Sequence, residues 1–242
     1  LLLLVLVSGG TEGRAQTQDP APSAAASQSR FCANEPADRS LDARGLALVY
    51  CTSHPAVTVP LHGAHTTARL FFYGGVPATW VGAAITQDPS VVAAAYRLTL
   101  TQVLTYGLVV GTKHAVGRAR PYVHRPLKAR VDRHDPPDPG DAHLSFPSGH
   151  AGLSAALVTS WSLSHPRWYV IGPGALWATG VALSRVHLGV HYPSDILAGA
   201  VLGVGVAVLV DQLRRRVTPS PLRASPATQG LRAPPLVLRV QF

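Results

Sequence analysis

Three short groups of residues combine cationic, imidazole and hydroxyl side chains with glycine. The first runs from Lys113 to Pro121, the second is Pro147-Ser148-Gly149-His150, and the third runs from Ser184 to Asp195. Lysine and arginine bind anions, and a histidine beside a carboxylate can act as a nucleophile or as an acid–base group. These residue types together indicate chemistry on an anionic group such as phosphate.

The first group places two cations at a helical spacing. Lys113 and Arg120 are seven residues apart, about two helical turns, so we expect both on one face of a helix that Pro121 then stops. Two cations stacked in this way can hold one anion. Basic residues near a helix C-terminus also complement the helix dipole, so this group alone leaves a structural role open.

The second group has the features of a helix start that accepts an anion. Ser148 suits an N-cap, Gly149 lets a ligand approach the backbone, and His150 follows in the first turn. Free N–H groups at a helix N-terminus form a phosphate site. The alternative is a capped helix with an incidental histidine.

The third group contains a histidine and a carboxylate at close spacing. We expect Arg185 to end one helix and Pro193 to begin the next, with His191 in the break. Asp195, four residues later, can accept a hydrogen bond from one imidazole nitrogen and leave the other as a nucleophile. His187 is a rival nucleophile, but no carboxylate follows it at the same spacing.

The elements that must position these groups are apolar. Stretches of 14–17 residues without the alternation of a strand predict an all-α, six-helix bundle. The five strong ones are Leu70–Thr86, Leu98–Thr112, Ala151–Ser164, Trp168–Leu183 and Ile196–Val210, and a weaker sixth is Leu46–Leu61, which Pro55 and Pro60 interrupt.

The same stretches favour a membrane-embedded bundle over a soluble exported one. Ile196–Val210 has no polar side chain, and its Gly199 and Gly203 are spaced for close helix packing. Arg214-Arg215-Arg216 follows directly, as expected of a cytoplasmic end. The glycines and the proline within Leu70–Thr86 argue against a spanning helix there.

Composition divides the chain into four parts. Residues 1–15 are interpreted as the remnant of a secretory signal or as an anchor, 16–40 as a linker, 41–216 as the helical domain and 217–242 as a disordered proline-rich tail. Cys32 and Cys51 form either one disulfide or two buried thiols, and the sequence leaves both readings open.

The charge balance indicates an anionic partner. Charged residues make up 14% of the chain, against about 25% in an average protein, which excludes disorder of the whole chain. The net charge of +9 suits nucleic acid, phospholipid headgroups or a phosphorylated substrate. Export signals and the absence of interleaved stacking aromatics argue against nucleic acid.

Residues 113–134 hold seven of the basic residues. This segment either attracts an anion or forms a solvated loop.

Taken in order, Lys-x6-Arg-Pro, Pro-Ser-Gly-His and Ser-Arg-x5-His-x3-Asp resemble the signature of a known superfamily. It is the type 2 phosphatidic acid phosphatase and vanadium-dependent haloperoxidase superfamily, which includes lipid phosphatases and bacterial acid phosphatases. Every signature position is filled between residues 113 and 195, and the resemblance extends over roughly residues 41–213.

The resemblance implies a role for each signature residue. His191 attacks phosphorus, Asp195 orients it, and His150 protonates the leaving oxygen and then activates water. The phosphate oxygens are held by a set of cations and donors at the helix ends: Lys113, Arg120, Ser148, Gly149 and Arg185. No metal and no cofactor are implied.

The resemblance thus predicts a metal-independent phosphatase for phosphomonoesters or pyrophosphates that forms a phosphohistidine. An integral bundle implies lipid phosphates outside a bacterial inner membrane, whereas a soluble one implies a periplasmic acid phosphatase. Its expected partners are a phosphorylated substrate and the membrane, and not nucleic acid. A vanadate haloperoxidase needs helices for which the chain is too short, and His150 and His191 argue against an inactive phosphate-binding protein.

Overall fold

The computed structural model describes residues 31–33, 40–125, 127–130 and 139–219. Every regular element in these ranges is helical, so the predicted all-α class is confirmed there. The predicted signal or anchor at 1–15, most of the predicted linker and nearly all of the predicted tail lie outside the described residues.

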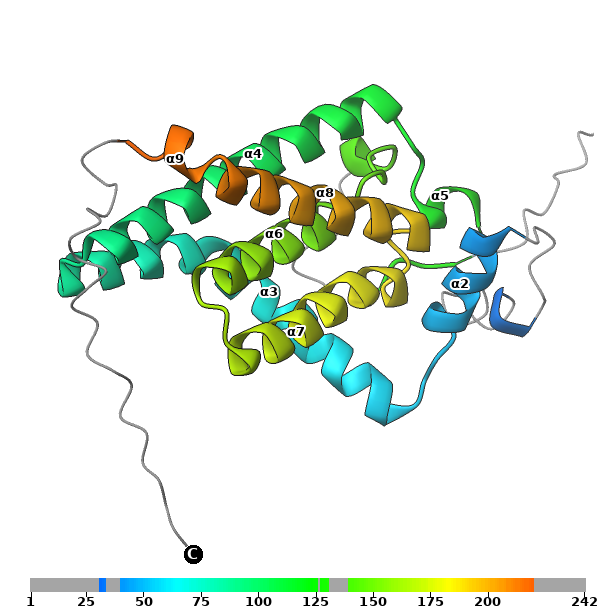
Figure 1. Cartoon of the computed structure of the whole chain (residues 1–242). Helices are drawn as coiled ribbons and strands as arrows, with labels where there is room; N and C mark the ends of the chain where they lie inside the picture. The colour runs from blue at the N-terminus through cyan, green and yellow to red at the C-terminus, as the bar shows by residue number, and fades with distance from the viewer. Residues whose placement is uncertain (1–30, 34–39, 126, 131–138, 220–242) are drawn as a thin grey trace, which may run out of the picture.

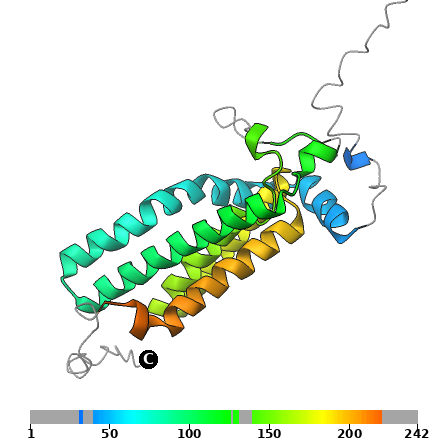
Figure 2. The same ribbon diagram turned by 90° about the horizontal axis from the view of Figure 1, so that it is seen from above.

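Five long helices form the bundle and bring the three groups to one end of it. They are α3 (Pro55–Thr86), α4 (Pro89–Val116), α6 (Gly149–Ser164), α7 (Trp168–His187) and α8 (Pro193–Gln212). The short helices α2 (Leu41–Tyr50) and α5 (Pro121–His124) lie at one end, and α9 (Arg214–Val217) lies at the other (Figures 1 and 2). Helix α6 packs against α3, α4, α7 and α8.

The expected helix from Lys113 to Pro121 is wrong. Helix α4 ends at Val116, and Gly117 follows in the left-handed conformation with φ 61°. Glycine adopts this conformation without steric cost and ends helices for that reason. Pro121 begins α5 rather than stopping α4. Lys113 and Arg120 therefore do not share a helical face, and a turn of the chain brings them to the site.

The weak stretch Leu46–Leu61 is divided between two helices. Helix α2 ends at Tyr50 and α3 begins at Pro55, where proline fits because the first helical N–H has no partner within the helix. Helix α3 then continues through Pro60 and Pro77 for 32 residues, so Leu70–Thr86 is its second part. Packing of its buried face against α4 and α7 outweighs the local cost of the prolines.

Glycines bring α8 into backbone contact with α6, as their spacing predicted. A Cβ atom on Gly203 would lie 2.1 Å from the Gly152 carbonyl oxygen, and one on Gly199 would lie 2.3 Å from the Ser148 carbonyl oxygen. The Ser148 N–H also donates to the Asp195 carbonyl at 2.9 Å. The second and third groups are thus fixed against each other through these two helices.

A small apolar core attaches α2 to the site end of the bundle. It contains Phe31, Leu46, Tyr50, Leu127, Val186 and Tyr192. Cys32 and Cys51 form a disulfide that closes this unit, which decides between the two readings of these cysteines. Phe31 and Cys32 show that part of the segment interpreted as a linker is packed on the domain.

The outward faces of the long helices carry large apolar side chains. Leu70 is 69% exposed, Leu176 75% and Leu197 67%, and they come from α3, α7 and α8. Within the part of the chain that the structure describes, α8 alone is long and apolar enough to cross a membrane by length and composition.

Candidate active site

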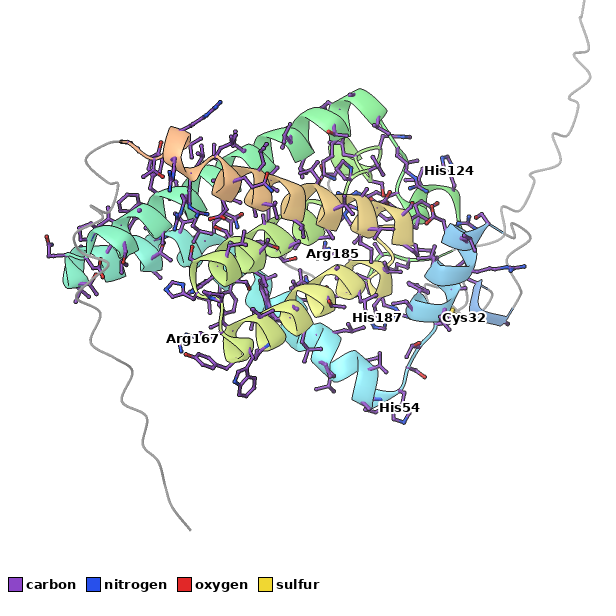
Figure 3. All side chains as sticks on the ribbon, viewed as in Figure 1. Cys32, His54, His124, Arg167, Arg185 and His187 are labelled. Carbon is purple, nitrogen blue, oxygen red and sulfur yellow. A yellow bond between two sulfur atoms is a disulfide. The ribbon has the colours of Figure 1, made fainter. Side chains whose placement is uncertain are left out.

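All eight predicted site residues lie where helices begin or end at the α2 end of the bundle. Lys113 is in the last turn of α4, Arg120 precedes α5, and Arg185 is in the last turn of α7. Ser148 caps α6, with its Oγ 3.5 Å from the Ala151 nitrogen, and Gly149 and His150 open that helix. Figure 3 shows Arg185 and His187 near one end of α7 and Arg167 near the other.

His191 and Asp195 face each other, but their separation is longer than the expected hydrogen bond. His191 Nδ1 lies 3.6 Å from Asp195 Oδ2, and both side chains are buried. The same oxygen already accepts bonds from Ser145 Oγ at 2.6 Å and from the Tyr192 N–H at 2.8 Å. The carboxylate still favours a proton on Nδ1, which leaves Nε2 with its lone pair.

The other Asp195 oxygen is held by a network that the sequence analysis missed. Arg118 Nη1 donates to Asp195 Oδ1 at 2.6 Å, and Arg118 Nη2 donates to Asp42 Oδ2 at 2.7 Å. Asp42 in turn accepts the Ser194 N–H at 2.8 Å and the Ser194 hydroxyl at 2.6 Å. Helix α2 therefore helps to position the carboxylate that faces His191.

The pKa of Asp42 reflects this hydrogen-bond network. Burial raises the pKa of Asp42, but hydrogen bonds from Ser194 and Arg118 outweigh it and hold that pKa below its ordinary value. Asp42 is therefore an anion at neutral pH and keeps Arg118 in place.

His191 is held neutral. Burial, aided by the charges of Arg120, Lys113 and Arg185, lowers the pKa of the His191 imidazole to about 3, against the partial opposition of Asp195. The three cations lie at the same end of the bundle as this imidazole. A neutral imidazole can attack an electrophile whose negative charge such cations balance.

Two of these cations, Lys113 and Arg120, are fixed by the chain around them. Lys113 Nζ donates to the Leu144 carbonyl. Arg120 Nε donates to the Asp141 carbonyl at 2.9 Å and pairs with the carboxylate of that residue at 3.6 Å. Arg118 and Arg130 are likewise bonded to the core, so these members of the basic segment 113–134 are parts of the folded structure rather than a solvated loop.

A cavity of about 840 Å³ opens beside these groups, between α3, α4 and α6. Lys113, Gly149, His150 and Arg185 form its polar end. The remaining wall is largely aromatic and aliphatic, with Phe72, Val103, Tyr106, Val110 and Leu153. The Phe72 and His150 rings meet edge to face at 5.4 Å between centroids. The arrangement suits a ligand with an anionic head and an apolar body.

The rival histidine lies outside this arrangement. His187 Nδ1 is 3.1 Å from the Val49 carbonyl oxygen, and its Nε2 is 3.2 Å from Arg130 Nη1. Both ring nitrogens thus have partners other than Asp195.

The fold is an all-α bundle, and histidines and cations gather where its helices begin and end. The chain therefore belongs to the class of helical proteins that have an anion-binding site at one end of the bundle. The chain belongs to the PAP2 superfamily, whose family model matches residues 91–219, more than half of the chain. That range contains all three groups of the signature.

Curated relatives match parts of the chain. A decaprenylphosphoryl-5-phosphoribose phosphatase of Mycobacterium tuberculosis (strain ATCC 25618 / H37Rv) is 36% identical over 46% of this chain and 55% of its own length. An undecaprenyl-diphosphatase of Sulfolobus acidocaldarius is 37% identical over 31% of this chain and 36% of its own. A lipid A 1-phosphatase of Rhizobium johnstonii is 35% identical over 40% and 38%. The chain spans about half the length or less of these relatives.

Two solved structures share the fold. Aquifex aeolicus LpxE superposes with a TM-score of 0.57 and 22% identity, over 72% of this chain and 97% of that one. A transmembrane PAP2-type phosphatidylglycerolphosphate phosphatase from Bacillus subtilis gives a TM-score of 0.54 at 20% identity, over 78% and 93%. The predicted family and bundle type are therefore confirmed.

Proposed function

We propose that the chain is a phosphatase that hydrolyses a lipid phosphate monoester or diphosphate through a phosphohistidine at His191. The observation that carries the proposal is the large cavity, which joins Lys113, His150 and Arg185 to an apolar wall. A phosphate head fits the cationic end, and a lipid chain fits the wall. The named activities of the relatives support the same substrate class.

In the first chemical step, His191 Nε2 attacks phosphorus and the bond from phosphorus to the lipid oxygen breaks. His150, which lines the cavity that holds the leaving group, enters this step as an imidazolium, a form that the negative charge of the bound phosphate favours, and donates its proton to that oxygen. The lipid leaves as a neutral alcohol, or as a monophosphate if the substrate is a diphosphate. Asp195 stabilises the positive charge that develops on the His191 ring.

In the second step, His150 accepts a proton from water, and the resulting hydroxide attacks phosphorus. The phosphorus–nitrogen bond breaks, its electron pair returns to Nε2, and orthophosphate is released. The imidazole of His191 is neutral again, as it is in the resting site. Each step uses one histidine as nucleophile or leaving group and the other for proton transfer.

Charge stabilisation comes from the protein itself. Phosphoryl transfer depends mainly on positioning and on neutralising the charge of the non-bridging oxygens. Lys113 and Arg185 line the polar end of the large cavity, and together with Arg120 they supply this charge in our proposal. A divalent metal is therefore not needed for the reaction.

We further propose that the bundle spans a membrane with the site end outside. Exposed apolar residues cover the long helices, and aromatic residues near the α9 end, Trp80, Trp161, Trp168 and Tyr169, resemble an interfacial belt. Arg214–Arg216 follow at that end, which favours the cytoplasmic side. The disulfide at the opposite end suits an oxidising compartment.

The proposal predicts lipid phosphate hydrolysis that survives chelation. Purified protein in detergent should release phosphate from a lipid monophosphate or diphosphate in excess EDTA, because the site cations carry the charge. Vanadate should inhibit competitively, since its five-coordinate form resembles the transition state. The assay measures inorganic phosphate, with His191→Ala protein as the blank.

Activity that disappears with EDTA and returns with magnesium or zinc would contradict the mechanism. Hydrolysis of short soluble phosphoesters with no preference for a lipid chain would contradict the substrate class.

A further inference from the structure

A second cavity of about 400 Å³ lies between α3 and the end of α7, next to the large cavity. We call it the side cavity. Its lining combines apolar residues with three histidines, one arginine and two hydroxyl residues: Val59, Leu61, Leu188, His62, His65, His187, Arg130, Thr58 and Ser184. None of the described residues that line it is acidic. A cavity with this lining attracts anions.

The side cavity is connected to the catalytic cations through one histidine. His65 lines both cavities, and its Nδ1 lies 3.1 Å from Nη1 of Arg185. Arg185 belongs to the polar end of the large cavity and acts electrostatically on His191. An anion that leaves Arg185 therefore meets His65 first and the remaining imidazoles next.

Two residues that line the side cavity, His187 and Arg130, are held by contacts with the fold. His187 Nδ1 donates to the Val49 carbonyl, so Nε2 is the acceptor that faces Arg130. The Arg130 guanidinium lies 4.0 Å above the centre of the Tyr50 ring. This stacking holds a permanent positive charge at the cavity wall.

The volume of the side cavity and its position beside Arg185 indicate which reaction product it can bind. His150 lines the large cavity, so the leaving lipid alcohol remains there. The side cavity lies on the Arg185 side, and its smaller volume and its guanidinium and imidazole side chains, with no acidic residue among the described lining residues, suit a small hydrated anion. Orthophosphate, the other product, has the matching charge and size.

We propose that the side cavity binds the orthophosphate released by hydrolysis and forms its route out of the site. This inference rests on the proposed phosphatase function. His62 is the residue that tests it, because His62 is exposed and lies outside the catalytic groups.

The test is an isothermal calorimetric titration of inorganic phosphate into protein that carries one equivalent of vanadate, because excess vanadate resembles phosphate and would also fill the side cavity. Vanadate occupies the catalytic position, so any phosphate that still binds does so elsewhere. We expect one phosphate to bind, and His62→Glu to weaken it by about tenfold or more, because a carboxylate replaces a donor beside the anion. The matched control is His165→Glu, since His165 is exposed at the opposite end of the bundle.

The proposal is overturned if protein that carries one equivalent of vanadate binds no phosphate, or if His62→Glu and His165→Glu bind it equally. Product inhibition gives a second readout: mixed inhibition by phosphate in the unmodified protein should become purely competitive in His62→Glu. Failure of the proposed function looks different. In that case the unmodified protein is inactive or fails to bind vanadate. Titration of phosphate without vanadate into His62→Glu and His165→Glu then still shows whether the side cavity binds phosphate.

Discussion

At the scale of single residues, Asp195 depends on side chains that are distant in sequence. Arg118 and Ser145 hold its two oxygens at 2.6 Å each, and Asp42 anchors Arg118 from α2. A carboxylate fixed on both oxygens cannot rotate away from His191. The orientation of the proposed nucleophile therefore depends on groups that do not line the large cavity.

This dependence predicts that Arg118 is a positioning residue. Arg118→Ala should lower kcat by about 10²-fold with little change in KM, because Asp195 and His191 lose their alignment while the cavity keeps its cations. Arg118→Lys should recover part of kcat, since it restores one charged donor. Steady-state kinetics on a lipid phosphate measures both constants.

Arg44→Ala is the control for Arg118, because Arg44 is exposed on the same helix as Asp42. A rise in KM at constant kcat would instead place Arg118 in substrate binding.

The two histidines can be separated by the step that each performs. In His150→Ala, a substrate whose leaving group needs no proton, such as p-nitrophenyl phosphate, should still phosphorylate His191. Hydrolysis of the intermediate lacks its base and should slow by about 10²–10⁴-fold. Acid-labile phosphate should therefore accumulate and map to His191 by mass spectrometry.

Two variants serve as controls for this experiment. His191→Ala should form no phosphoenzyme, and Asp195→Asn should form it slowly, because the tautomer is no longer fixed. Stable phosphate on His187 or His150 would overturn the assignment of the nucleophile.

The candidate site could be predicted from sequence where the motif order itself carries the information. His150, His191 and Asp195 stand at fixed spacings around helix starts, and the structure places them at those starts. Asp42 and Ser145 had no such signal, because their roles arise from contacts across 152 and 50 positions. Arg118 was visible only as one basic residue among several.

At the scale of elements, the contact between α6 and α8 sets the geometry of the site. The carbonyls of Ser148 and Gly152 lie against Gly199 and Gly203, so no side chain separates the two helices. The same contact fixes the start of α6, with His150, relative to the start of α8, with Asp195. A change in helix spacing would therefore move both groups.

Gly203→Ala should destabilise the protein by about 1–3 kcal/mol, because its Cβ would overlap the Gly152 carbonyl oxygen. Gly205→Ala is the matched control: no atom lies within 4 Å of its Cβ position, so the higher helix propensity of alanine should preserve or raise stability. Thermal unfolding in detergent compares the two. Equal unfolding temperatures would mean that the helices adjust without cost.

Helix boundaries were harder to predict than the helices. Glycine at position 117 is itself a signal for a helix end, but the spacing of Lys113 and Arg120 favoured a longer helix. Pro55 marks the division between α2 and α3 in the sequence, but the core that α2 forms with Val186 and Tyr192 is not encoded locally. The apolar stretches correctly predicted the five long helices because each must bury at least one face.

At the scale of the whole molecule, the two ends of the bundle differ in chemistry. The site end carries the disulfide, α2 and the cavities, whereas the other end carries the exposed aromatic residues and Arg214–Arg216. Between them, apolar side chains face outward from the long helices. This division matches two aqueous compartments separated by an apolar layer.

The division predicts opposite accessibility for two histidine positions. His124 ends α5 at the site end and His165 follows α6 at the other end, and both are exposed. In intact cells, an impermeant thiol reagent should label His124→Cys and spare His165→Cys, while both should react after the membrane is permeabilised. The native cysteines are paired and give no background. Equal labelling of both positions in intact cells would mean that no membrane separates the two ends, and would favour a soluble exported bundle. Labelling of His165→Cys alone would reverse the orientation and place the catalytic groups in the cytoplasm.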